Sequence, residues 1–343
     1  MSVSKKLILD VIIVIIGIFL IFLTNLYSPV EINGEKRIEI KRGEKVEEIA
    51  DDLLEQNLIK SKFTFTLYLN FKKACGKKVL AGEYKIGGKK NIKQIGDILT
   101  SGEGIVLEKK ITIKEGWTKE KIAQYLVSQG LIRKEEDFFT ALDKIQREID
   151  ENKFSLSYDF LKDKPKGTGL EGYLFPDTYR VYKQTSAEAL IKKFLDNFDK
   201  KMNPHLREVI KEKGRTIHQI VTLASIIEKE VAKDNDRRIV ADIFYKRLEN
   251  NLPLQADSTI NYITKKNKLR SSIRDTKIDS PYNTYKYRGL PPGPICNPGM
   301  SSILAAIYPQ KTDYWYFLTT PEGKVIFRKD YAGHISAKEK YLK

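Results

Sequence analysis

The chain has 343 residues, enough for two or three domains, and carries 61 basic against 45 acidic side chains, a net charge of +16. Such a charge suits nucleic acid, an anionic membrane surface or an acidic polymer as partner. The three histidines show no metal-ligand spacing and there is no HExxH or CxxC motif, so we expect no metal and no cofactor. The two cysteines, Cys75 and Cys296, lie far apart and are interpreted as unpaired.

The N-terminal segment 7–26 is apolar, and Asp10 is its single charged residue. Twenty residues at the helical rise match the roughly 30 Å hydrocarbon core of a bilayer. Lys5 and Lys6 precede the segment, so its short tail is expected in the cytoplasm. No small-residue cleavage site follows, which favours a retained anchor over a signal peptide. We therefore expect residues 1–28 to form a cytoplasmic tail and a single transmembrane helix in the plasma membrane. The rest would lie outside the cytoplasm, which excludes a nucleic-acid partner.

Two segments of the chain are similar to each other. Residues 38–59 (IEIKRGEKVEEIADDLLEQNLI) align without gaps to residues 111–132 (ITIKEGWTKEKIAQYLVSQGLI). Each predicts a short strand, a glycine turn and an amphipathic helix. The pattern resembles the first half of a LysM module, which binds N-acetylated glycans, although a small α+β unit without a ligand explains it equally well. We expect a LysM-like domain at 29–108, and the second repeat with a connecting subdomain at 109–165.

Residues 166–343 are expected to form a mixed α+β domain, which gives an α+β fold class for the chain. Helical periodicity covers 186–202, 216–233 and 235–250. A late alternating run, YWYFLTTPEGKVIFRKD, predicts a β-hairpin across PEGK.

The predicted helix 216–233 contains two glutamates, Glu228 and Glu230. Residues three, four and seven apart share a helix face, which places Glu228 with apolar neighbours such as Val221. Desolvation raises the pKa of a carboxyl and suits it to general-acid catalysis. Glu228 is therefore the candidate catalytic residue. The alternative is a structural ion pair with Arg237 or Arg238.

Side chains suited to sugar binding follow this helix. Amides, carboxylates and hydroxyls hydrogen-bond to sugar hydroxyls, while aromatic rings provide stacking faces. The stretch 289–299, rich in Gly and Pro, predicts a stiff loop next to them. The candidate substrate-binding residues are Gln255, Asp257, Thr259, Tyr282, Asn283, Tyr285 and Glu171.

Several motifs, EGYLFPDTY, ASIIEKEVA, LPLQADSTINY, SPYNTYKYRGLPPGPICNPG and FRKDYAGHISAKEKY, closely resemble the YceG-like (MltG-type) endolytic murein transglycosylase family. The resemblance runs from about Ile38 to the C-terminus. It implies a plasma-membrane enzyme that cuts the bond between N-acetylmuramic acid (MurNAc) and N-acetylglucosamine (GlcNAc) in nascent peptidoglycan. The product would carry a 1,6-anhydro-MurNAc end, and strand elongation would stop. It also implies peptidoglycan synthases as partners, and a catalytic glutamate at the first position of EKE, Glu228. Some members have Thr and Pro where this chain has Ala256 and Ser258.

A single carboxylate is sufficient for such a reaction. Ordinary glycosidases use two, but here a protonated Glu228 would donate to the glycosidic oxygen and then accept a proton from the muramic C6 hydroxyl. Two alternatives stay open. One is a hydrolytic muramidase with Glu171, Asp177 or Asp257 as second carboxylate, and the other is a non-catalytic, membrane-anchored wall-binding protein. A penicillin-binding enzyme is excluded, because its SxxK candidate, Ser2–Lys5, lies in the predicted cytoplasmic tail and QKTD (310–313) lacks the glycine of the companion KTG motif.

Overall fold

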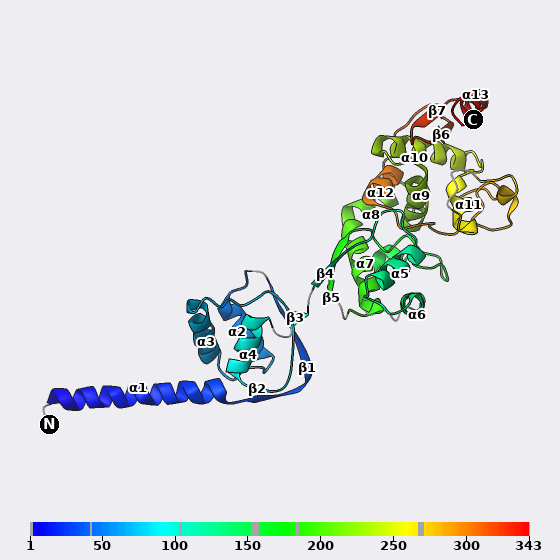
Figure 1. Ribbon diagram of the computed structural model, residues 1–343. Helices are drawn as coiled ribbons and strands as arrows, with labels where there is room; N and C mark the ends of the chain where they lie inside the picture. The colour runs from blue at the N-terminus through cyan, green and yellow to red at the C-terminus, as the bar shows by residue number, and fades with distance from the viewer. Residues whose placement is uncertain are drawn as a thin grey trace. The chain divides into compact units, whose positions relative to one another are not determined.

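The computed structural model describes residues 3–41, 43–102, 105–106, 108–151, 158–182, 185–266 and 271–342. The chain folds as two compact units: residues 1–109 form almost all of the first, and residues 110–181 and 185–343 form the second (Figure 1). Each unit has its own hydrophobic core.

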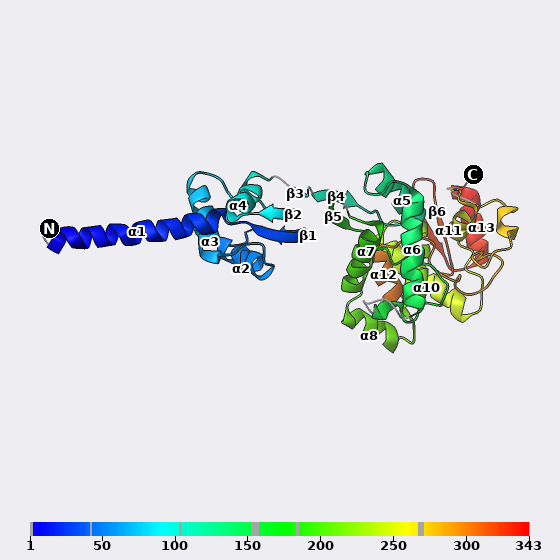
Figure 2. The same ribbon diagram turned by 90° about the horizontal axis from the view of Figure 1, so that it is seen from below.

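The first unit begins with α1 (Val3–Tyr27), and most of this helix extends beyond the rest of that unit (Figure 2). Its window Asp10–Tyr27 has a mean hydropathy of 2.4 and is 6% buried. Length and composition suffice to cross a membrane, a property that signal sequences share. At its C-terminal end, Leu26 is buried in the core of the first unit and Phe22 packs against that core.

The rest of the first unit is a small antiparallel sheet with three helices. Strand order is β1-β2-β3. Ser61 caps α3 by accepting the N–H of Thr64, and Asn91 forms a capping box with Gln94 at the start of α4. The elements are β1 (Val30–Ile40), α2 (Val46–Glu55), α3 (Lys62–Ala74), β2 (Gly82–Lys90), α4 (Ile92–Ser101) and β3 (Ile105–Val106).

The second unit is mostly helical, with two small two-stranded sheets, β4-β5 and β6-β7. The helix α9 is central, because all its residues from 217 to 227 except Gln219 are buried and α8, α10, α11 and α12 all contact it. The elements are β4 (Glu108–Thr112), α5 (Lys119–Ser128), α6 (Glu135–Asp150), η1 (Asp159–Leu161), β5 (Thr178–Tyr182), α7 (Ala187–Lys201), α8 (Pro204–Glu212), α9 (Ile217–Glu230), α10 (Asp234–Glu249), α11 (Asp257–Thr264), η2 (Asp275–Lys277), α12 (Met300–Ile307), β6 (Tyr316–Thr319), β7 (Val325–Arg328) and α13 (Tyr331–Tyr341).

The mixed α+β class predicted from the sequence is confirmed. Both repeats form a strand, a turn and a helix, with the turn glycines Gly43 and Gly116 at φ of 81° and 72°. The three predicted helices of the second half correspond to α7, α9 and α10, and the predicted hairpin is β6-β7. The LysM-like character of the first unit stays a prediction. Both cysteines are free, with Cys75 exposed and Cys296 buried.

Candidate active site

The C-terminal end of α9 places two glutamates against different neighbours. Thr216 and Gln219 form a capping box that starts this helix. The helix ends at Glu230 because Val231 is extended, with φ of −143° and ψ of 143°. Glu228 and Glu230 therefore both lie in the last turn, two residues apart, and project to different sides.

Glu228 is held by three donors and packed out of solvent. Arg237 Nη2 donates to its Oε1 at 3.1 Å, while the Gly299 N–H (3.1 Å) and Ser302 Oγ (2.7 Å) donate to its Oε2. The Glu228 and Arg237 side chains are 7% and 8% exposed. Gly299 is the N-cap of α12 and has no side chain to accept the free N–H groups there, so Glu228 takes that role.

Glu230 lies at the N-terminus of α11 instead. Its Oε1 accepts the Ser258 N–H at 3.2 Å. In the described part of the chain, Ser258 is the one residue that forms hydrogen bonds to the Glu230 carboxyl group. The N-cap of α11, Ala256, offers no side-chain acceptor, so this carboxyl caps the helix. Burial raises the pKa of Glu230, and the charge of Asp257 raises it further.

Glu230 lines a groove of about 810 Å³. Three of the predicted sugar-binding residues, Gln255, Asp257 and Tyr285, line the same groove. The Tyr285 hydroxyl donates to Asp257 Oδ1 at 2.9 Å, and the Ser271 N–H donates to the same oxygen at 3.1 Å. Glu228 does not line this groove.

One wall of this first groove is held in an unusual backbone conformation. Gln255 has φ of +55°, in the left-handed region, and its N–H donates to Thr284 O at 3.0 Å. Arg247 donates to Gln255 Oε1 at 3.4 Å, and its guanidinium lies 5.2 Å from the ring centroid of Tyr316. In the described ranges, no carboxylate lies within ion-pair distance of Arg247. Arg247 also donates to the backbone carbonyls of Pro253, Leu254 and Trp315, so it holds the chain at Gln255 against this wall of the groove.

A second groove, of about 600 Å³, adjoins the first. Both are lined by Lys229, Ser258 and Asn261. In the second groove Tyr262 and Tyr282 stand with ring centroids 5.0 Å apart. Its charged lining is mainly basic, from Lys121, Lys229, Lys265 and Lys266 against Glu120.

Two of the predicted substrate-binding residues are fully buried and shape the loops instead of lining a groove. Thr259 Oγ1 donates to Ala256 O at 2.8 Å. Asn283 Nδ2 donates to two backbone carbonyls, those of Thr276 (3.0 Å) and Ile278 (2.7 Å). These bonds fix the chain around Tyr285, whose N–H donates to Asn283 Oδ1 at 3.0 Å.

Glu171 is also buried, at the N-terminus of α5. Both its oxygens accept the Lys119 N–H at 3.1 Å, and Asn297 Nδ2 donates to it at 2.7 Å. Burial raises the pKa of Glu171 to about 8. Asn297 Oδ1 in turn accepts the N–H groups of Gly172 and Leu174, both at 2.9 Å. Glu171 lines neither groove, and its contacts tie the Gly/Pro-rich loop to α5.

Reasoning from the sequence missed the residues at the junction of the two grooves. Apolar periodicity continues through Val231, which hid the end of α9 and with it the exposure of Glu230 to the groove. Lys229 and Arg247 have no local pattern that separates them from the other lysines and arginines of predicted helices. The alternation of polar residues at 255–259 gave no sign that a helix begins at Asp257.

The chain is similar to known proteins over most of its length. The sequence profile of the YceG-like family matches residues 38–340. An endolytic murein transglycosylase of Bacillus subtilis (strain 168) is 37% identical over 337 residues, which cover 96% of this chain and 91% of the relative. One from Streptococcus pneumoniae (serotype 2, strain D39) is 33% identical over 89% of this chain and 58% of the relative. The crystal structure of a yceG-like protein of Listeria monocytogenes superposes with a TM-score of 0.60 at 32% identity, and covers 88% of this chain and 98% of that one.

Proposed function

Because the chain belongs to the YceG-like family, we propose that it is an endolytic murein transglycosylase. It cleaves the MurNAc–GlcNAc bond of nascent peptidoglycan strands, leaves a 1,6-anhydro-MurNAc end and so terminates elongation beside the synthases. In this proposal α1 anchors the chain in the plasma membrane with its short N-terminal tail in the cytoplasm. The observation that carries the chemistry is a half-buried carboxyl of raised pKa, Glu230, in the wall of a groove.

We assign the proton donor to Glu230 in preference to Glu228. The oxygens of Glu228 are occupied by donors from Arg237, Gly299 and Ser302, and it forms a buried ion pair with Arg237. Glu230 has the Ser258 N–H on one oxygen and faces the groove. A general acid must hold its proton near neutral pH, which the raised pKa of Glu230 favours.

The reaction needs one carboxyl group acting twice. Glu230 gives its proton to the glycosidic oxygen as the bond from C1 of MurNAc to that oxygen breaks. The C6 hydroxyl of the same sugar attacks C1, and its proton passes to the Glu230 carboxylate. No water is consumed, because the nucleophile belongs to the substrate and intramolecular attack has a large effective molarity. The N–H of Ser258 stabilises the carboxylate while it is charged.

The two adjoining grooves suit a strand that continues on both sides of the cleaved bond. In the first groove, Gln255, Asp257 and Tyr285 present hydrogen-bonding groups to the sugars. In the second, Tyr282 with Tyr262 gives aromatic faces for stacking. Thr259, Asn283 and Glu171 act on the substrate indirectly, by holding these loops in place.

Product analysis tests the proposal. Purified glycan strands are incubated with the parent protein or with Glu230→Gln, and their ends are identified by mass spectrometry. We expect internal cuts with anhydro ends from the parent and none from the variant. Reducing ends from the parent protein would instead show a hydrolase, and an absence of any cleavage would favour a wall-binding protein.

A further inference from the structure

Helix α3 of the first unit is apolar on two faces. One face is buried in the core through Phe65, Tyr68 and Leu69. The other presents Phe63, Leu67 and Phe71 to solvent, 72%, 47% and 65% exposed. These three residues follow each other at intervals of four, so they form one continuous stripe along the helix. Single exposed apolar residues are common, but an exposed stripe with two phenylalanines indicates a contact surface.

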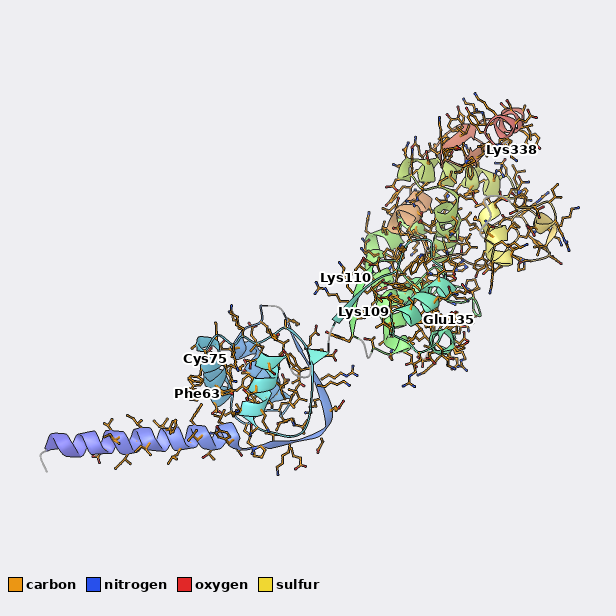
Figure 3. The ribbon with its side chains drawn as sticks, in the orientation of Figure 1. Phe63, Cys75, Lys109, Lys110, Glu135 and Lys338 are labelled. Atoms are coloured by element: carbon orange, nitrogen blue, oxygen red, sulfur yellow. The ribbon has the colours of Figure 1, made fainter. Side chains whose placement is uncertain are left out.

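The stripe begins at the point where α1 ends. Lys60 Nζ, just before α3, donates to Ser28 Oγ at 2.8 Å. In Figure 1, α3 runs across the direction of α1, on the side of the first unit from which α1 protrudes. In Figure 3, Phe63 lies on the side of α3 toward α1 and Cys75 lies farther from it. A bilayer spanned by α1 would therefore have its surface at the level of α3.

The charges around the stripe suit an anionic surface. Residues 60–78 contain six lysines and no acidic residue. Two of the lysines are paired within the unit, with Asp51 and Asp97. The other four are exposed, and no ion pair to them occurs in the described part of the chain; they are Lys60, Lys73, Lys77 and Lys78. Apolar side chains flanked by lysines are the composition of helices that lie in the lipid headgroup region.

We propose that α3 is a second membrane contact, and that Phe63, Leu67 and Phe71 insert into the headgroup region of an anionic bilayer beside α1. The inference rests on the proposed anchoring by α1. It adds that the first unit lies against the membrane surface, instead of pivoting freely on its anchor.

The exposed thiol of Cys75 allows a direct test, since the other cysteine, Cys296, is buried. The full-length chain is labelled at Cys75 with an environment-sensitive fluorophore and reconstituted into phosphatidylcholine vesicles containing phosphatidylglycerol. We expect a blue-shifted emission that lipids brominated near the headgroup quench. The variant Phe63→Ser/Leu67→Ser/Phe71→Ser should lose most of this quenching, and omission of phosphatidylglycerol should weaken it.

The matched control is Ile273→Ser, which removes an apolar side chain that is 80% exposed in the second unit and should leave quenching unchanged. Retained glycan cleavage and far-UV circular dichroism show that the triple variant is folded. Flotation with the vesicles tests the α1 anchor separately. If the chain floats with the vesicles but its label is not quenched, the contact by α3 is overturned and the anchoring by α1 is not. Equal quenching in the parent and the triple variant also overturns it. So does cross-linking of unlabelled chains through Cys75 when the labelled chain shows no quenching, which would assign the stripe to a second copy.

Discussion

The two glutamates at the end of α9 should respond in opposite ways to the same substitution. Glu228→Gln removes the charge that faces the buried guanidinium of Arg237 and weakens the cap of α12. Glu230→Gln keeps an oxygen that can accept the Ser258 N–H and removes the cost of partly burying a carboxylate. Glu228→Gln should therefore lower the stability of the second unit with little direct effect on the chemical step. Glu230→Gln should slow the chemical step and leave the stability nearly unchanged.

The expected magnitudes follow from burial. Removal of one partner of a buried ion pair costs about 3–5 kcal/mol. Asp234 still pairs with Arg237 at 2.8 Å after this substitution, and it partly compensates the charge of the guanidinium although its own side chain is 78% exposed. We therefore expect a cost at the lower end of this range. A unit of 150–250 residues loses about 2–4 °C of Tm per kcal/mol, which gives a decrease of about 6–12 °C for Glu228→Gln. For Glu230→Gln we expect a change in stability under about 1 kcal/mol and a loss of about 10²–10⁴ in cleavage rate.

Thermal unfolding followed by tryptophan fluorescence measures the first effect. Both tryptophans, Trp117 and Trp315, belong to the second unit, so the signal reports on the unit that contains the site. Cleavage of glycan strands, measured well below both transitions, gives the second effect. The assignment of Glu230 as proton donor would be refuted if Glu228→Gln kept the parental Tm but could not cleave, while Glu230→Gln stayed active.

Two further predictions concern pH and backbone. Burial raises the pKa of Glu230, and the acid form is required, so kcat/KM for glycan cleavage should fall as rising pH ionises this carboxyl. A rate that is flat with pH on that side would contradict its role as acid. Gly172→Ala should destabilise the second unit by about 2–5 kcal/mol, because φ is +90° and the new Cβ would lie 2.5 Å from Pro294 Cγ and 2.9 Å from Val221 Cγ1. Urea unfolding measures this change, and an unaltered midpoint would show that the loop at Pro294 can move to make room for the new Cβ.

The elements that the sequence predicted are those with their own local signals. The helix α9 has an apolar period and a capping box at Thr216, and the β6-β7 hairpin has alternation on both sides of its turn. The helix α11 was missed, because it is short and starts with polar residues at Asp257. Its N-terminus is satisfied by Glu230 from a distant segment, which no local pattern contains.

The sequence names single candidate side chains for the site but does not give their arrangement. Periodicity shows that Glu228 and Glu230 face different ways, but not which of them meets a groove. That depends on Ser258 and Gly299, which lie later in the chain. The amide of Asn283 illustrates the same limit, since a side chain that suits a sugar equally suits the backbone carbonyls it bonds here.

The burial of Leu26 and the packing of Phe22 against the first unit have a practical consequence for truncated proteins. A recombinant form that starts at Ser28 would lose α1, and with it two side chains that help to fill the interior of this unit. The opening left behind would be apolar and prone to self-association. A better starting point lies before Phe22, with the exposed apolar residues upstream of it removed or replaced by polar ones.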